Sequence, residues 1–310
     1  GKMYITHRDY EPILAVPYDM PVPGYCNGTV NTLRLWSAET DGPGFDFAMF
    51  SKGDHERAIE SKTNVDAITN VLYPDDSTPR GKLLRLKQEY FFTSAGIQSI
   101  LRKIKKNGIS LYDLHNYVAI QINDTHPALA VPELMRILID EEGFTWDDAW
   151  NVTVKTLGYT NHTILAEALE KWNIDMFKKL LPRVYMIVEE INRRFTGDLY
   201  NKYNGDWNRI SRMSVIQDGV VKMAHLAIVG SHSVNGVAEL HTEILKHQEL
   251  KDFHEFYPGK FNNKTNGIAH RRWLMLSNPN LSNLITELIG NDWCRDTMQL
   301  KNLEKYKHDM

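Results

Sequence analysis

One short turn places a carboxylate, a hydroxyl and an imidazole in consecutive positions, Asp124, Thr125 and His126. An apolar run at 118–122 precedes the turn and is typical of a buried strand, and a helical pattern at 132–142 follows it. Carboxylates and imidazoles suit ligand hydroxyls, because a hydroxyl both donates and accepts hydrogen bonds. Since α/β folds bind ligands at the carboxyl ends of their strands, the pattern predicts a ligand site here.

An alternative interpretation of the same turn is structural. Asp124 or Thr125 would be a helix N-cap, with Pro127 at the first helical position. The spacing is compatible with both interpretations.

Tyr73 and Arg85 are two further candidates. Tyr73 lies in a Pro-flanked loop, where an exposed ring would stack on a flat apolar surface such as a sugar ring; alternatively, the ring is half-buried and anchors the loop. Arg85 and Glu89 are four residues apart on a helix predicted over 83–104 and can form an ion pair. That pair would lie on the surface unless the helix borders a cleft.

His162 precedes two carboxylates, Glu167 and Glu170, which raises the possibility of acid–base catalysis or a zinc site. The chain contains no H-E-x-x-H motif, and the spacing from His162 to Glu167 is not that of a known ligand pair. We therefore discount both acid–base catalysis and a zinc site at His162.

Three later histidines are seven and nine residues apart, His225, His232 and His241. Their surroundings favour structural roles over a metal cluster, with His232 as the exception nearest to the expected cleft.

The composition is that of an ordinary globular protein, with 42% hydrophobic and 24% charged residues in 310. A net charge of −3 excludes the strongly basic surface that nucleic acids attract. No apolar run approaches the ~18 residues that span a membrane. From the residues given we expect no signal peptide. Since Cys26 and Cys294 also form no redox or metal motif, we expect a cytoplasmic protein.

Strand and helix patterns alternate along the chain and predict an α/β fold, a mostly parallel sheet with helices on both faces. The apolar runs at 118–122 and 226–229 should be parallel neighbours or near-neighbours. Four side chains should then converge at one side of the sheet: Asp124, His162, His232 and Asn266. The other expected elements are strands and turns over 1–50 (with a strand at 4–6), helices at 54–60, 65–71, 145–157, 167–181 and 184–195, a helix capped by Ser231 that carries Val234 to Ile244, a connection at 261–266 and a helix from about 271.

Six segments, in the same order, resemble those of the α-1,4-glucan phosphorylases, the glycogen, starch and maltodextrin enzymes. They are PYDMPVPGY with VNTLRLWSA (17–25, 30–38), LYPDD with GKLLRLKQEYF (72–76, 81–91), NDTHPALAVPELMR (123–136), YTNHT with EALEKW (159–163, 167–172), MAHL with VGSHSVNGVA (223–226, 229–238) and NKTNGI with RRWL (263–268, 271–274).

The resemblance implies roles for particular residues in glucan binding. It makes Tyr73 the stacking platform for the acceptor glucan and places Asp124 and His126 at the acceptor subsite. It places Asp76 and Arg85 beside the cleft, on the glucan or phosphate side.

His162 and Asn266 are implicated at the cleavage point. In the family the histidine corresponding to His162 lies against the glucosyl ring, largely through its backbone carbonyl, so His162 is the residue implied at the catalytic centre. Asn266 is implied to meet the 6-hydroxyl of the transferred glucose; alternatively, Asn-Gly is a plain turn.

The resemblance also implies the domain organisation and the chemistry. Residues 1–265 would be most of the N-terminal glucan-binding domain, a Rossmann-like half of a two-domain GT-B glycosyltransferase, and 266–310 would cross toward a C-terminal cofactor domain. The parent would be a homodimer that uses phosphate and pyridoxal phosphate to release glucose 1-phosphate. The cofactor lysine would lie beyond position 310, since Lys222 and Lys264 have no cofactor-binding context, so we expect the piece alone to be inactive and to bind no cofactor.

Two other functions stay open. The chain could be a stand-alone glucan-binding module. It could also be a retaining glycosidase, for which Asp124 and Glu167 offer carboxylates; that mechanism requires two carboxyl groups about 5 Å apart.

Overall fold

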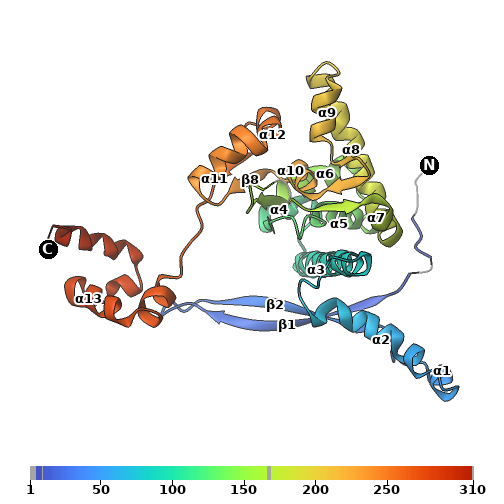
Figure 1. Ribbon diagram of the computed structural model, residues 1–310, viewed down its shortest axis with the longest axis horizontal. Helices are drawn as coiled ribbons and strands as arrows, with labels where there is room; N and C mark the ends of the chain where they lie inside the picture. Colours follow the sequence, from blue (N-terminus) through green and yellow to red (C-terminus); the bar gives the residue numbers. More distant parts are fainter. Residues whose placement is uncertain (1–4, 9, 166–168, 309–310) are drawn as a thin grey trace. The chain divides into compact units, whose positions relative to one another are not determined.

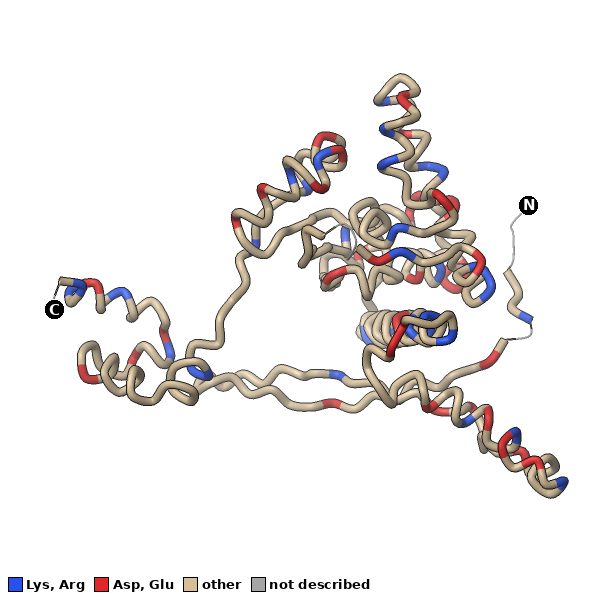
Figure 2. Tube along the Cα trace, viewed as in Figure 1, with Lys and Arg blue, Asp and Glu red and all other residues tan. Residues whose placement is uncertain are grey.

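The computed structural model describes residues 5–8, 10–165 and 169–308. They divide into two compact units, the first formed by Gly1–Tyr18 and Trp36–Thr265, the second by Asp19–Leu35 and Asn266–Met310. The coloured trace in Figure 2 shows that basic and acidic residues are intermixed along the helices of both units. In the described parts of the chain, none of the helices is both long and apolar enough to cross a bilayer.

The first unit is built on a parallel sheet whose strands follow the order β3-β4-β8-β9. Each strand pairs with the one before it in that order, in parallel. Helices flank the sheet, with α4, α5, α6 and α10 close to it in Figure 1. The predicted α/β class is therefore confirmed. The strands are β3 (Ile120–Asn123), β4 (Leu157–Thr160), β8 (Ser233–Gly236) and β9 (Phe261–Asn263), and the helices named are α4 (Leu114–Tyr117), α5 (Ala130–Arg136), α6 (Trp146–Thr156) and α10 (Met223–Val229).

The two faces of this sheet differ in chemistry. In register across the strands, Ile122, Tyr159, Val234 and Phe261 form one row, and every member is buried. The next row, on the opposite face because side chains alternate along a strand, is polar. Its members are Asn123, Thr160, Asn235 and Asn262.

The polar face is held together by side-chain hydrogen bonds. Gln121 Nε2 donates to Thr160 Oγ1 at 2.9 Å, and Thr160 Oγ1 donates to Asn235 Oδ1 at 2.9 Å. Asn262 Nδ2 donates to Ser233 Oγ at 2.8 Å. The polar groups on this face thus satisfy one another across the strands.

The long helix α3 (Pro79–Lys106) shows why the helical predictions succeeded. Thr78 caps its start by accepting from Gly81 N, and Pro79 occupies the first turn. Lysines occupy the last turn, where their positive charges interact favourably with the negative end of the helix dipole. The predicted apolar stripe is buried in α8 (Pro182–Lys202), which likewise begins at a proline.

The remaining elements of the first unit surround this framework. They are α1 (Phe47–Ser51), α2 (His55–Asn70), the 3₁₀ turn η1 (Leu111–Asp113), the π turns η2 (Ile137–Glu141) and η4 (Leu245–Glu249), β5 (Lys171–Asn173), α7 (Ile174–Leu180), α9 (Trp207–Met213), β6 (Ile216–Gln217), β7 (Val220–Lys222), α11 (Glu239–Ile244) and α12 (Lys251–Phe256). Strands β5, β7 and β6 form a separate antiparallel sheet.

The hairpin β1 (Ile13–Pro23) and β2 (Val30–Thr40) contributes its outer residues to the second unit. In that unit, Arg34 and Asp19 pair across the hairpin at 2.7 Å. The unit's small core contains Ile285, Trp293 and Cys294. Its helical elements are the π turn η5 (Arg271–Leu276), α13 (Pro279–Ile289) and the 3₁₀ segments η6 (Asp292–Cys294) and η7 (Thr297–Tyr306).

Several sequence-based predictions were wrong. The apolar run at 226–229 is not a strand, because it lies in α10, where nearly every side chain is buried and a continuous apolar run is as compatible with a helix as with a strand. The strand that follows is the short, polar β8, which we had assigned to a helix capped by Ser231. The parallel neighbour of β3 is consequently β4, which begins at the last residue of the helix expected at 145–157 and for which no strand was predicted.

Other differences are smaller. The two helices expected at 54–60 and 65–71 are one helix, α2, and the connection at 261–266 contains β9. Ile5 and Thr6 are not in a strand. Of the helix expected at 167–181, residues 167 and 168 lie outside the described residues, and β5 precedes α7 in the remainder.

The close approach of α10 to α5 supports a test of packing. A Cβ on Gly230 would lie 2.4 and 2.5 Å from the two methyl carbons of Val131, which is fully buried. We expect Gly230→Ala to lower the free energy of unfolding by about 1–3 kcal/mol through overpacking, measured by urea denaturation.

Gly259→Ala is the matched control, because nothing lies within 4 Å of its added Cβ. Combining Gly230→Ala with Val131→Ala should cost less than the sum of the two, since the second change vacates the space that the first requires. Equal stability of the Gly230 and Gly259 variants would contradict this account of the packing.

Candidate functional site

Backbone hydrogen bonds align the carboxyl ends of the parallel strands. Asp124 N donates to Thr160 O at 2.9 Å, and Asn161 N donates to Asn235 O at 3.0 Å. Lys264 N, just after β9, donates at 3.1 Å to Gly236 O at the end of β8. The turns after β3, β4, β8 and β9 therefore begin along one edge of the sheet, where α/β folds place their ligands.

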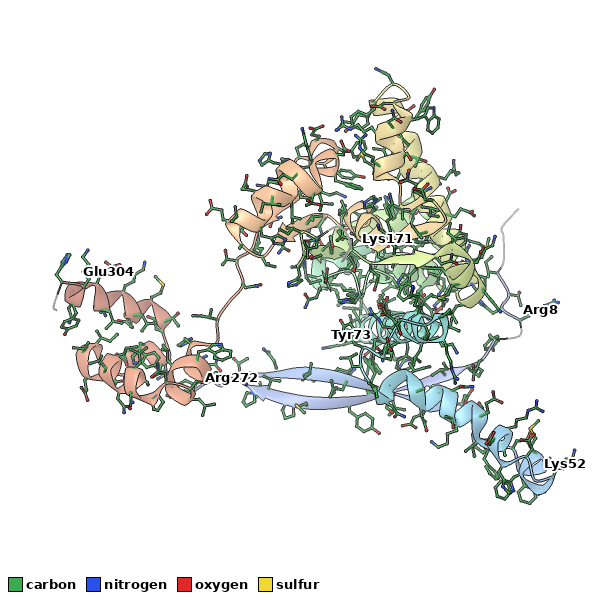
Figure 3. All side chains as sticks on the ribbon, in the orientation of Figure 1. Arg8, Lys52, Tyr73, Lys171, Arg272 and Glu304 are labelled. Atoms are coloured by element: carbon green, nitrogen blue, oxygen red, sulfur yellow. The ribbon has the colours of Figure 1, made fainter. Side chains whose placement is uncertain are left out.

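Tyr73 and His126 meet beside this edge although 53 residues separate them. Tyr73 Oη lies 2.9 Å from His126 Nδ1, and the two rings meet edge to face at 5.1 Å. The Arg85 guanidinium carbon lies 5.1 Å from the centre of the tyrosine ring, within cation–π range. Tyr73 remains 52% exposed, so part of its ring is open to a ligand. Figure 3 labels Tyr73 beside α3.

The loop that carries Tyr73 is tied to α3 by Gln88. The buried Gln88 side chain accepts from Tyr73 N at 3.1 Å and donates to the carbonyl oxygens of Ile68 and Val71 at 2.8 and 3.0 Å. Tyr73 itself has a positive φ of 55°, a backbone conformation uncommon for a side chain of this size. The amide of Gln88 therefore holds a strained residue in place.

Asp124 does not cap the helix that follows it. The N-cap of α5 is Leu129, without a side-chain hydrogen bond, so the structural alternative for Asp124 and Thr125 is wrong. Asp124 has a φ of 59°, which an aspartate tolerates better than most residues. Its Oδ1 is buried and accepts no hydrogen bond in the described structure. The carboxylate thus retains acceptor capacity at the sheet edge.

His162 follows β4 and pairs with an amide rather than a carboxylate. Its Nε2 lies 2.6 Å from Asn123 Oδ1, which gives the ring an orienting contact at the ends of two adjacent strands. The order of the strands thus brings Asp124 and His162 to the same edge.

Arg85 is the most heavily coordinated side chain at this site. It lies 3.0 Å from Glu89, 3.1 Å from Asp76 and 3.2 Å from Glu170. The expected pairing with Glu89 is present, but it is not a surface pair, because the Arg85 and Glu89 side chains are 15% and 7% exposed.

Glu170, Gln88 and Asn123 were not singled out as partners of these residues. Glu170 is 85 residues from Arg85, and no local periodicity connects them. Gln88 falls on the buried side of a predicted helix, where a polar residue was the available signal. Asn123 was visible only as a polar residue at the end of a strand.

Asn266 is exposed and belongs to the second unit, so its role at the cleavage point stays a prediction. Of the later histidines, His225 Nδ1 lies 2.9 Å from Ser214 O, and burial lowers the pKa of this imidazole to about 4. His241 Nδ1 accepts from Val237 N at 3.1 Å, and His232 N donates to Leu157 O at 3.0 Å. Across the described residues, no three potential ligands gather as a metal site would require.

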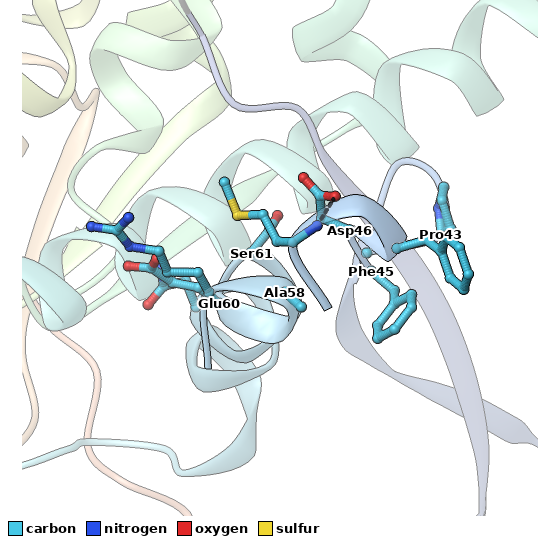
Figure 4. A pocket seen from close by; sticks show the side chains of 11 residues that line it. Pro43, Phe45, Asp46, Ala58, Glu60 and Ser61 are labelled. Atoms are coloured by element: carbon cyan, nitrogen blue, oxygen red, sulfur yellow. Dashed lines mark hydrogen bonds between the residues drawn. The ribbon is translucent and has the colours of Figure 1, made fainter. Parts of the chain in front are cut away.

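Two hollows in the described structure do not coincide with these residues. One hollow, of about 740 Å³, lies at α1 and α2, and Figure 4 shows the side chains that line it. Asp46, one of them, accepts from Met49 N at 3.0 Å. A second, of about 1170 Å³, borders α3 on the side of Arg102. Neither is lined by a predicted site residue, so both are separate from the sheet edge.

Comparison with known proteins gives one consistent result. The family model for carbohydrate phosphorylases matches residues 1–310. Glycogen phosphorylase of Bacillus subtilis (strain 168) is 54% identical over 309 residues, covering 100% of this chain and 38% of the relative. The muscle form from Mus musculus is 50% identical over 312 residues (97% and 37%), and the brain form from Homo sapiens is 50% identical over 306 (95% and 36%).

The chain thus spans less than two-fifths of the length of these relatives, at high identity throughout. A match from the first residue to the last agrees with the parallel sheet and the polar strand ends described above. The chain belongs to the carbohydrate phosphorylase family.

Proposed function

We propose that this chain is the glucan-binding part of an α-1,4-glucan phosphorylase. The observation that carries the proposal is the contact of Tyr73, His126 and Arg85 beside the edge of the parallel sheet. A half-exposed aromatic ring offers a stacking surface for a sugar, and the adjacent imidazole and carboxylate offer hydrogen bonds to its hydroxyls.

The residues divide the work of binding. Tyr73 stacks on an acceptor sugar, while Asp124 and His126 bind its hydroxyls. The free Oδ1 of Asp124 supports this role, since a buried carboxylate oxygen without a donor is costly until a ligand supplies one. Asp76 and Arg85 complete the wall of the cleft.

At the cleavage point, His162 positions the terminal glucosyl unit, and Asn266 binds its 6-hydroxyl. The hydrogen bond from His162 to Asn123 supports a positioning role, because it fixes the ring and the backbone at the end of β4.

The whole protein would cleave a terminal α-1,4-linked glucose with phosphate and release glucose 1-phosphate. Pyridoxal phosphate, when bound, would supply a phosphate group as proton relay. The lysines considered from the sequence do not fit it: Lys222 Nζ and Lys264 Nζ donate to the amide oxygens of Gln217 and Asn262 at 2.5 and 2.7 Å. The cofactor site would therefore lie in segments outside this chain. The whole protein would act as a cytoplasmic homodimer.

The second candidate is a glucan-binding module without phosphorolysis of its own. The same contacts favour it, since they bind sugar without supplying a nucleophile. A retaining glycosidase has less support, because the described structure gives Asp124 no carboxylate partner, and Glu167 lies outside the described residues. The product of incubation with glucan and phosphate distinguishes the three functions. A phosphorylase forms glucose 1-phosphate, a binding module forms no product, and a glycosidase forms free glucose.

Replacing the tyrosine tests the stacking role. In the whole phosphorylase, Tyr73→Ala should weaken oligosaccharide binding by about 1–3 kcal/mol, the amount expected for losing a large buried side chain. Tyr73→Phe keeps the ring and should retain most of the affinity. Tyr112→Ala removes an equally exposed tyrosine outside the site and is the matched control. If Tyr73→Ala binds oligosaccharide like the Tyr112 variant, the ring does not stack on glucan.

Replacing Asp124 distinguishes a role in sugar recognition from a role in folding. Because Asp124 caps no helix, Asp124→Asn should leave the melting temperature nearly unchanged while lowering turnover of maltoheptaose, since the amide replaces an acceptor by a donor. Melting and kinetics are measured on the same preparation. A variant that melts early but turns over normally would assign Asp124 a purely structural role.

The chain itself should form no specific adduct with pyridoxal phosphate. The described lysine whose pKa is lowered furthest is Lys260: burial lowers it to about 7, but its Nζ is buried and donates to the carbonyl oxygens of Ile228 and Val229 at 3.0 and 3.3 Å. We expect borohydride treatment with the cofactor to label lysines diffusely, by peptide mass spectrometry. One lysine labelled stoichiometrically, with glucose 1-phosphate formed from glycogen, would place the catalytic centre inside this chain.

A further inference from the structure

Three carboxylates surround one guanidinium in the first unit. Arg85 Nη2 donates to Glu89 Oε1 at 3.0 Å and to Glu170 Oε2 at 3.2 Å, and Nη1 donates to Asp76 Oδ2 at 3.1 Å. The Glu89 and Glu170 side chains are 7% and 12% exposed, whereas Asp76 is 50% exposed. The two glutamates are therefore the carboxylates whose ionisation costs the most solvation free energy.

The second oxygens of these two glutamates are the unexplained feature. Glu89 Oε2 and Glu170 Oε1 are both buried, and neither accepts a hydrogen bond in the described structure. An ionised carboxylate is an acceptor only, so two such oxygens in one buried cluster repel each other. A single proton would turn one carboxylate into a donor for the other and satisfy both atoms.

The surrounding charges favour that proton. With every carboxylate ionised, one arginine would face three negative charges, and two of these would be removed from water. Burial, followed by the charge of Glu170, raises the pKa of Glu89 well above its ordinary range, while Arg85 acts in the opposite direction. The titratable groups facing the cluster come from five segments. They are Arg85 and Glu89 from α3, Tyr73 and Asp76 from the loop before it, Asp124 and His126 from the turn after β3, Tyr159 from β4, and Glu170 before β5.

We propose that Glu89 and Glu170 share one proton as a carboxylic acid–carboxylate pair, and that this pair positions Arg85 beside the ring of Tyr73. The pair takes its proton from solvent when the chain folds. Glu89 and Glu170 are positioning residues, since they act on the Tyr73 ring through Arg85. The proposal concerns the protonation of the folded chain and stands apart from what the chain binds.

The pair makes stability depend on pH in a defined direction. Because the pKa of Glu89 is raised above 4.5, its ordinary value, the folded chain binds a proton that the unfolded chain releases. The resulting stabilisation is fully present below that ordinary value and is lost as the pH rises through the folded-state pKa. Ionised carboxylates paired with arginine would produce the opposite dependence.

The test compares the chain with its Glu89→Gln and Glu170→Gln variants. Each amide can donate to the remaining carboxylate, as the acid does, without titrating. From urea denaturation at mildly acidic to mildly alkaline pH, the number of protons taken up on folding should fall by about one in either variant. Glu249→Gln, at an exposed position, is the matched control and should leave that number unchanged.

Infrared spectroscopy detects the proton directly. At neutral pH, when exposed carboxyl groups are ionised, the chain should show the carbonyl stretch of one protonated carboxylic acid, and either single amide variant should lack it. The control variant should keep it. A chain without this band, and with proton uptake equal to that of its amide variants, would show that both glutamates are ionised and would overturn the proposal.

A separate measurement tests the positioning of Tyr73. The ring signals of ¹³C-labelled Tyr73, assigned by Tyr73→Phe, should shift over the pH interval in which the proton is lost, and should stay constant in Glu89→Gln. A buried pair with no influence on Arg85 would leave these signals unchanged in the unsubstituted chain, and the positioning role would then be wrong.

Discussion

The register of the parallel sheet is the constraint on which the rest of the first unit depends. One row of side chains, from Ile122 to Phe261, is apolar and buried, and the adjacent row is polar. A shift of one residue in any strand would exchange the rows and bury amides in the core. The same register aligns the carboxyl ends of the strands, so the turns carrying Asp124 and His162 begin at one edge of the sheet.

Arg85 plays a comparable part at the edge itself. A guanidinium that is largely removed from water has to be balanced by carboxylates, and here they come from its own helix, from the preceding loop and from the residue before β5. The ion cluster thereby joins segments that share no secondary structure. Breaking it by removing one partner would leave a buried charge uncompensated, which is why such clusters constrain the conformation around them.

The sequence predicted long elements and missed short ones. Helix α3 has a side-chain cap, α8 begins at a proline, and both bury apolar stripes over several turns; both were expected. Strands β4 (LGYT) and β8 (SVNG) are four residues long and contain glycine and polar residues, so their identity comes from the neighbours with which they pair. Helix α10 was misassigned for the converse reason, because burial on all sides removes the helical period.

In the candidate site, too, local contacts could be predicted from the sequence and long-range contacts could not. The pairing of Arg85 with Glu89 was predicted because it is local, four residues along one helix. The contacts of Tyr73 with His126 and of Arg85 with Glu170 span 53 and 85 residues, and only the folded chain brings them together. The resemblance to phosphorylases named most of these residues without their partners, since a motif records which residues are present and not what they contact.

The order β3-β4-β8-β9 has a consequence for how the sheet is assembled. Each new strand is added beside the one formed before it, so no strand has to be inserted between two that are already paired. During synthesis, β3 and β4 can dock while the later strands are still on the ribosome, and the sheet then extends in one direction as the chain emerges. This order suits vectorial folding from the amino end, because every intermediate sheet is a contiguous part of the final one.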